Sequence, residues 1–323
     1  MNNLFIFVFV FIIFIGIACY FYYDIFNMIY NEKIKPVIEK FNRTKNVKKN
    51  IVWTYIEDPI FYNNDYDIQL LVRSKNIPTL LKFCLRILQN KFNKTMNSLY
   101  VVTPFNVKKY LPDFPIEMNA DSKYSIKFRV DLLAASLLEK YGGLFISPGT
   151  VVLQDLDEIL YNLNNKYDLI TFGGSIRNIN SCNDALNPGN YIIAAKPNNP
   201  VIVDYRKKML RNLYDQGYTD KLISEDLLSY SLQSIKPKSY FHFNCEYTGN
   251  VNNINHIVSL EEYFGYEPIQ FKNKDNLIFI ALPYDLILYD IDYKWVNNLS
   301  EEQFVEANTN ITEIISKEVY KIK

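Results

Sequence analysis

The segment from Arg129 to Leu153 constrains the fold of this chain more than any other part of its sequence. An amphipathic helical pattern runs into Gly142 and Gly143, a short apolar strand follows, and that strand breaks at Ser147-Pro148-Gly149-Thr150. Glycine commonly ends a helix because it adopts the left-handed backbone conformation without strain. In α/β enzymes the ligand lies beyond the carboxyl ends of the strands. We therefore predict a ligand site at the strand tip that Ser147 to Thr150 form.

Strand-like and helix-like segments alternate along the chain, which favours an α/β fold with a mostly parallel central sheet and flanking helices. The predicted strands are rich in β-branched and aromatic residues, and the predicted helices carry apolar residues three and four positions apart. We expect strands at 51–56, 99–103, 144–146, 167–172 and 190–195, and helices at 77–92, 122–141, 199–214 and 223–232. Beyond residue 236 we expect short strands and loops.

The charge and composition of the chain exclude some classes of protein. The 323 residues carry 35 Lys and Arg against 35 Asp and Glu, so the formal net charge is zero and no nucleic-acid partner is indicated. Hydrophobic residues make up 49% of the chain, which is enough for a packed core and argues against disorder.

The first residues of the chain form an apolar run. Leu4 to Tyr23 contains no charged residue and is long enough to cross a bilayer as a helix. The alternatives are a signal peptide, which normally has a basic start and a shorter apolar run, and a buried core helix. We favour a membrane anchor at 1–23, followed by a polar stalk at 24–49 and one large domain at 50–323.

The orientation of a single-pass anchor can be predicted from charge and cysteine use. Seven Lys and Arg residues follow the apolar run before residue 50, and the positive-inside rule then places the large domain in the cytosol. Cys84, Cys182 and Cys245 are an odd number with no metal-binding spacing, which agrees with a reducing compartment. We slightly favour the cytosolic side on these grounds.

Several sequence blocks carry a family resemblance through their order and spacing. These blocks are Ile51-Val52-Trp53-Thr54-Tyr55, Asp131-Leu132-Leu133-Ala134, Tyr141-Gly142-Gly143-Leu144-Phe145-Ile146-Ser147, Val151-Val152-Leu153, Leu156-Asp157 and Asn190 to Ala195. Together they resemble the DXD-type glycosyltransferase family that includes the capsular polysaccharide synthesis proteins and the Och1-like sugar-binding region. The resemblance covers about residues 50–235.

The resemblance implies a GT-A fold with a nucleotide-sugar donor over the carboxyl ends of the central strands, and a glycan or lipid-linked acceptor. Trp53 would stack on the base, and Asp131 would contact ribose or sugar hydroxyls. The other residues implied for donor binding are Tyr55, Arg129, Gly142, Gly143, Ser147 and Thr150. The family also implies Mn²⁺ or Mg²⁺, because paired carboxylates hold a cation that neutralises the leaving diphosphate.

The chain departs from this family pattern at the metal-binding acids, because Ser147-Pro148-Gly149 stands where both carboxylates are expected. Three interpretations remain open. The enzyme is metal-independent, and Arg129, a lysine and backbone N–H groups neutralise the diphosphate. Alternatively, acids from elsewhere hold the metal, the candidates being Asp155, Glu225 and Asp226. In the third interpretation the fold persists without catalysis.

Acids outside the strand tip are therefore of interest. Asp155 and Asp157 have the family's Asp-x-Asp spacing but a displaced position, which makes them weak metal candidates. Glu225 and Asp226 join Asp131 as candidate catalytic residues, although acids in a first helical turn are common because they favour the helix dipole. We expect a membrane-anchored glycosyltransferase, and the alternative is an inactive relative that binds glycan or a protein partner at the membrane.

Overall fold

The structure is a computed structural model that describes residues 50–57, 77–91, 97–118, 122–174, 182, 184–215 and 224–320. The compact unit that contains these residues runs from Lys49 to Lys323. The predicted anchor and stalk lie outside the described residues. Within the described part, no helix is both long and apolar enough to cross a membrane.

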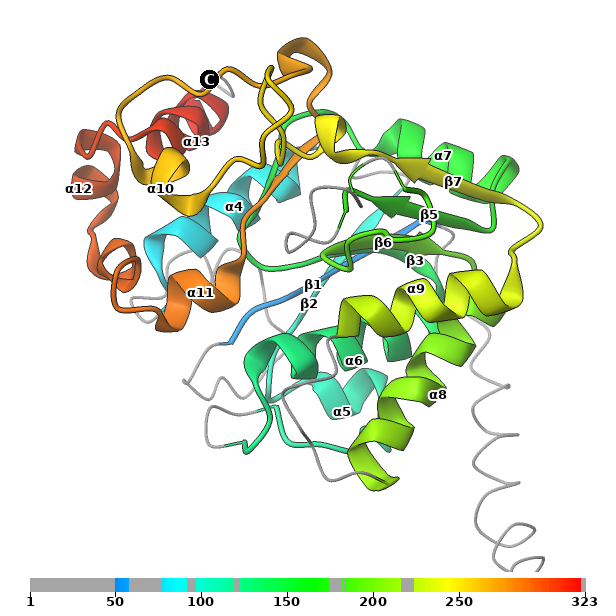
Figure 1. The fold of residues 1–323 in the computed structure, drawn as a ribbon. Helices are drawn as coiled ribbons and strands as arrows, with labels where there is room; N and C mark the ends of the chain where they lie inside the picture. The colour runs from blue at the N-terminus through cyan, green and yellow to red at the C-terminus, as the bar shows by residue number, and fades with distance from the viewer. Residues whose placement is uncertain are drawn as a thin grey trace, which may run out of the picture. The chain divides into compact units, whose positions relative to one another are not determined.

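A six-stranded sheet forms the centre of this unit (Figure 1). Its strands, in spatial order, are β2 (Ser98–Val102), β1 (Ile51–Tyr55), β3 (Gly143–Ile146), β6 (Ile192–Ala195), β5 (Leu169–Phe172) and β7 (Tyr240–Phe243). β1 pairs in parallel with β2 and β3, β5 pairs in parallel with β7, and β6 is antiparallel to both of its neighbours. The predicted mixed α/β fold with a mostly parallel sheet is therefore confirmed.

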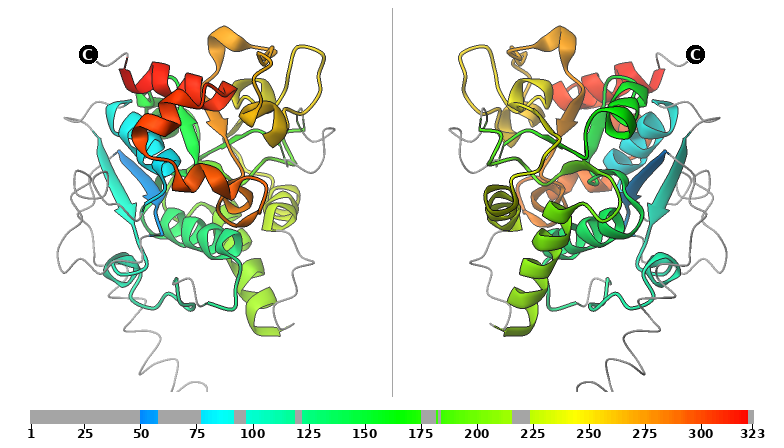
Figure 2. Two further views of the ribbon diagram at one scale, coloured as in Figure 1. Left: turned by 90° about the vertical axis from the view of Figure 1, so that its left-hand side faces the viewer. Right: turned by 90° about the vertical axis from the view of Figure 1, so that its right-hand side faces the viewer.

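Helices and a small second sheet surround the central strands (Figures 1 and 2). The helices up to β7 are α4 (Thr79–Asn90), α5 (Val107–Tyr110), α6 (Ile126–Tyr141), α7 (Asp157–Asn165), α8 (Pro200–Asp215) and α9 (Ser224–Ile235). α6 packs against β1, β3 and β6, and α8 packs between α6 and α9. The chain leaves the tip of β3 into β4 (Thr150–Val152), which pairs antiparallel with β8 (Phe279–Ala281).

The part of the chain after β7 is more helical than the sequence pattern predicts. It contains α10 (Leu260–Phe264), α11 (Tyr284–Tyr289), α12 (Glu301–Glu306) and α13 (Asn310–Tyr320), besides the 3₁₀ turns η3 (Cys245–Tyr247), η4 (Lys274–Asn276) and η5 (Lys294–Asn298). The expectation of short strands and loops was wrong here. Capping boxes at Ser259 with Glu262 and at Ser300 with Gln303 start two of these helices, and both are sequence signals of a helix start.

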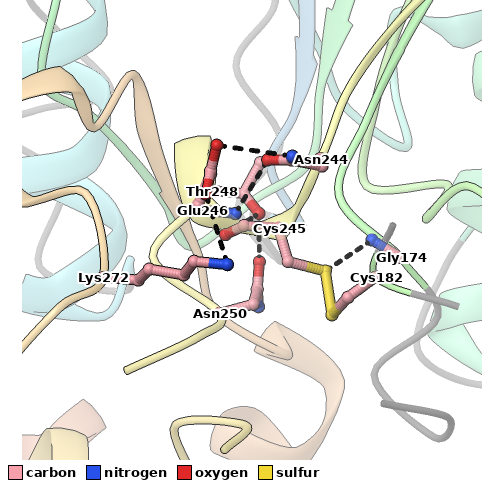
Figure 3. Close-up of a disulfide and its surroundings, with 8 residues drawn as sticks. All are labelled: Gly174, Cys182, Asn244, Cys245, Glu246, Thr248, Asn250 and Lys272. Carbon is pink, nitrogen blue, oxygen red and sulfur yellow. Dashed lines mark hydrogen bonds and ion pairs between the residues drawn. A yellow bond between two sulfur atoms is a disulfide. The ribbon is translucent and has the colours of Figure 1, made fainter. Parts of the chain in front are cut away.

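A disulfide joins Cys182, in the connection from β5 to β6, to Cys245 after β7 (Figure 3). Both half-cystines are buried, and the amide of Gly174 donates a hydrogen bond to the Cys245 sulfur over 3.1 Å. Cys84 is the free thiol among the described cysteines, and its burial raises its pKa to about 12. The odd cysteine count therefore does not indicate a fully reduced protein, because two of the three form a pair.

Candidate functional site

The carboxyl ends of β1 and β3 and the start of β6 meet at one edge of the sheet, which we call the carboxyl edge. Ile146 is the last residue of β3, and it pairs with both Thr54 of β1 and Ile192 of β6. The chain enters β6 through Tyr191, whose carbonyl accepts a hydrogen bond of 2.9 Å from the amide of Ser147. The segment that follows β3 and the segment that precedes β6 therefore lie side by side.

Three polar side chains form a cluster at the carboxyl edge, and we call it the Lys127 cluster. The Lys127 ammonium donates to Asp131 Oδ2 over 3.1 Å and to Asn190 Oδ1 over 2.8 Å. Asn190 Nδ2 donates to the same Asp131 oxygen over 2.8 Å. Asp131 and Asn190 are buried, whereas the Lys127 side chain is 13% exposed. The ammonium also lies 4.5 Å from the centre of the Tyr191 ring, at the distance of a cation–π contact.

Arg129 lies on α6 two residues from Asp131, and its hydrogen bonds go to other parts of the chain. Its Nη1 donates to Glu57 Oε1 over 3.0 Å and to the Met118 carbonyl over 2.6 Å, and its Nε donates to the Tyr124 carbonyl. Arg129 is 2% exposed. It therefore ties α6 to the segment after β1 and contributes no accessible charge to a ligand.

The strand tip carries buried hydroxyls. Ser147 Oγ, Thr150 Oγ1 and the Tyr284 hydroxyl are buried and have no hydrogen-bond partner among the described residues. Gly149 lies between them, and a Cβ at that position would come within 3.1 Å of the Tyr284 Cβ. Burial, followed by the charge of Asp131, raises the pKa of Tyr284, so its phenol stays a neutral hydrogen-bond donor.

A small cavity lies between the tip and α4. It is lined by Thr54 to Ile56, by Ser147 to Thr150 with Ile146, and by the apolar side chains of Leu81, Cys84, Leu85 and Leu88. The space has room for about one water molecule. The space between the tip and α4 is therefore too small for a nucleotide sugar.

The structure places Asp131, Ser147 and Thr150 at the carboxyl edge, and their role in donor binding stays a prediction. Tyr55 also ends β1 there, but it is buried and its hydroxyl donates to the Met118 carbonyl over 3.0 Å. The prediction missed Lys127, Asn190, Glu57 and Tyr284. Lys127 could have been found because it precedes Asp131 by four residues, which is the spacing of a helical ion pair.

The prediction that Trp53 stacks on a base has to be corrected. Trp53 is 1% exposed, and its indole packs against Tyr100, Tyr110 and Tyr141 with ring centres 5.0, 5.4 and 5.4 Å away. Its Nε1 donates to the Gly142 carbonyl over 2.9 Å. The indole is therefore a core side chain with a satisfied polar group, and it offers no face to a ligand.

Gly142 and Gly143 also have a structural role instead of the predicted donor contact. They lie at the amino end of β3, at the opposite end of this strand from Ser147. Both have positive φ angles, 67° and 103°, and a Cβ on Gly143 would lie only 2.4 Å from the Ile51 carbonyl oxygen. Glycine is required there because the turn out of α6 brings the two backbones into contact.

The weak metal candidates Asp155 and Asp157 do not lie at the carboxyl edge. Asp157 accepts a hydrogen bond of 2.7 Å from Asn97, which immediately precedes β2 at the amino edge. Asp155 is exposed in the same connection into α7. The chain reaches this edge because β4 carries it away from the tip, so the Asp-x-Asp spacing is unrelated to the donor-site pattern.

Glu225 and Asp226 lie in the first turn of α9, as predicted, and Asp226 is exposed. The side chain of Glu225 is outside the described part of the structure. The catalytic role of this pair stays a prediction.

The residues at the carboxyl edge do not fit the divalent cation that the family pattern implies. Ser147 and Thr150 offer hydroxyls, which are weak ligands for hard cations without carboxylates. Among the described residues, no three or more His, Cys, Asp and Glu side chains are grouped to hold a metal ion. We therefore derive no step through a metal.

Comparison with known proteins identifies one matching family. The profile of the capsular polysaccharide synthesis protein family matches residues 74–272, which is more than half of the chain. No curated protein matches. Two crystal structures of the glycosyltransferase GlyE from Streptococcus pneumoniae TIGR4, one of them the apo form, are similar with TM-scores of 0.42 and 0.39 at 10% identity. Each match covers 85% of this chain and 61% of the other. With TM-scores this low, we draw no conclusion from the two structures.

Proposed function

The chain belongs to the capsular polysaccharide synthesis protein family, and from that premise we propose that it is a membrane-anchored glycosyltransferase. It moves a sugar from a nucleotide-sugar donor to a glycan or lipid-linked acceptor. Family membership supports glycosyl transfer in polysaccharide biosynthesis, and the apolar run Leu4 to Tyr23 supports the membrane anchor.

One structural observation carries the assignment of the donor site, and it is the position of the Lys127 cluster at the carboxyl edge. Buried charged side chains are costly unless they are paired, so such clusters concentrate at functional sites. Asp131 and Asn190 offer the acceptor and donor groups that recognise sugar or ribose hydroxyls. They lie where α/β folds bind their ligands. The site can therefore orient a donor through hydroxyl contacts.

A non-catalytic role is the alternative, and the sequence Ser147-Pro148-Gly149 favours it because the family's two acids are missing. In that case the same edge would bind a nucleotide or a glycan without transferring the sugar. Binding without turnover would distinguish this alternative from the enzyme.

A donor screen of the purified protein tests the proposal. UDP- and GDP-sugars are incubated with and without Mn²⁺, and release of the nucleoside diphosphate is measured, first without and then with oligosaccharide acceptors. We expect turnover with one donor class and a loss of at least about tenfold in Asp131→Asn, the size of one lost charged hydrogen bond. The matched control Asp275→Asn, an exposed acid in η4, should behave as the wild type. Absence of both turnover and nucleotide binding with every donor would overturn the proposal.

A further inference from the structure

We propose that Lys127 takes the place of the divalent cation in this protein and binds the diphosphate of the donor directly. This inference rests on the proposed function, because it assumes a nucleotide donor at the carboxyl edge. It assigns a residue that the family pattern does not include, and it makes donor binding independent of metal.

Two acids at this edge, Glu57 and Asp131, are already paired with cations of the protein. Glu57 accepts hydrogen bonds from Arg129 and from the Tyr289 hydroxyl, the latter over 3.1 Å. Asp131 Oδ2 accepts from both Lys127 and Asn190. Asp285, in the first turn of α11 and next to Tyr284, keeps one buried oxygen without a partner among the described residues. One such carboxylate beside neutral hydroxyls is a poorer ligand set than the paired acids of the family.

The Lys127 ammonium also disfavours a metal ion at the Asp131 carboxylate. It lies 3.1 Å from the Asp131 carboxylate, so a divalent cation bound to the same oxygen would be repelled by the ammonium. A metal could enter only by displacing Lys127 from Asp131 and Asn190. The positive charge beside this carboxylate is therefore already supplied by a side chain of the protein.

Lys127 is also the more exposed of the two cations that the structure describes in the first turns of α6. Its side chain is 13% exposed, whereas that of Arg129 is 3% exposed and bonded to Glu57 and to two backbone carbonyls. Contacts with Asp131, Asn190 and the Tyr191 ring hold the ammonium at the edge. Lysine is a common phosphate ligand because its ammonium is a compact point charge. The two cations thus have different roles: Arg129 holds the fold together, and Lys127 binds the diphosphate.

Nucleotide binding can separate this role from a structural one. The affinities of UDP and uridine, and of GDP and guanosine, are measured by calorimetry in EDTA and in MnCl₂. The proteins compared are the wild type, Lys127→Met, Lys127→Arg and the control Lys123→Met. Lys123 is exposed, lies four residues before Lys127 and ahead of α6, and contacts the Tyr124 ring. Comparing each nucleotide with its nucleoside isolates the diphosphate contact, because a collapsed site would weaken both.

We expect the wild type to bind one nucleoside diphosphate equally well in EDTA and in MnCl₂. Lys127→Met should weaken that binding at least about tenfold and leave nucleoside binding unchanged, because only the charge contact is lost. Lys127→Arg should restore part of the affinity, and Lys123→Met should have no effect. Binding that requires Mn²⁺, or an unchanged affinity in Lys127→Met, would overturn the inference and leave the proposed function standing. Absence of nucleotide binding in the wild type under both conditions would overturn both.

Discussion

Gly143 shows at the residue scale how one sequence motif can be assigned the wrong role. The pair Gly142-Gly143 stands in a block that resembles a donor-binding region, yet its conformation and contacts account for it without a ligand. A sequence gives the identity of a glycine but not the carbonyl that its missing Cβ avoids. The same is true of Trp53, since burial among three tyrosines depends on segments far away in the chain.

Gly143→Ala should therefore destabilise the protein. The new methyl group would lie 2.4 Å from the Ile51 carbonyl at a φ of 103°, and we expect a loss of about 2 to 4 kcal/mol in the free energy of unfolding. Urea denaturation of the purified domain measures this loss. A variant with wild-type stability but weakened nucleotide binding would instead show that Gly143 contributes to donor binding.

At the scale of elements, α6 is the helix on which the site depends. Its N-cap Ser125 accepts a hydrogen bond from the Phe128 amide, and its first two turns present Lys127, Arg129 and Asp131. The sequence predicted this helix and its glycine stop correctly, because both are local signals. It could not predict the partners of these side chains, Glu57 and Asn190, because they come from strand ends that only the fold brings near.

The ion pair between Arg129 and Glu57 gives a stability prediction at this scale. Arg129→Met removes the cation that pairs with Glu57 and two hydrogen bonds to backbone carbonyls, so we expect a loss of about 3 kcal/mol in the free energy of unfolding. Arg86→Met is the matched control, because the pair of Arg86 and Glu301 between α4 and α12 is 30% and 37% exposed. It should cost no more than about 1 kcal/mol. Equal losses in the two variants, measured by urea denaturation, would contradict the structural role of Arg129.

At the scale of the whole molecule, the alternation of strands and helices was enough to predict a mostly parallel sheet. The pairing of Cys182 with Cys245 was not predictable, because the two residues are 63 positions apart and give no local signal. Disulfides persist in oxidising compartments and are rare in the cytosol. The cysteine count therefore no longer supports a cytosolic domain. The positive-inside rule is the remaining support for that prediction.

The disulfide predicts the thiol content of the protein. In protein isolated from its own cells and then denatured, Cys182 and Cys245 should resist maleimide labelling until a reductant is added. Cys182→Ser/Cys245→Ser should lose about 4 kcal/mol of stability, the loop-closure value for a 63-residue separation. Labelling of all four cysteines without reductant would show that the protein is reduced where it works.

Hydrogen exchange measured by mass spectrometry, with and without a bound nucleoside diphosphate, tests the position of the donor site most directly. If the donor binds at the carboxyl edge, the nucleotide should slow hydrogen exchange in peptides that cover 125–131, 147–150 and 190–191. Peptides that cover 154–158, at the amino edge, should exchange at the same rate in both samples. Protection confined to 154–158, with no change at the carboxyl edge, would contradict the assignment of the donor site to the Lys127 cluster.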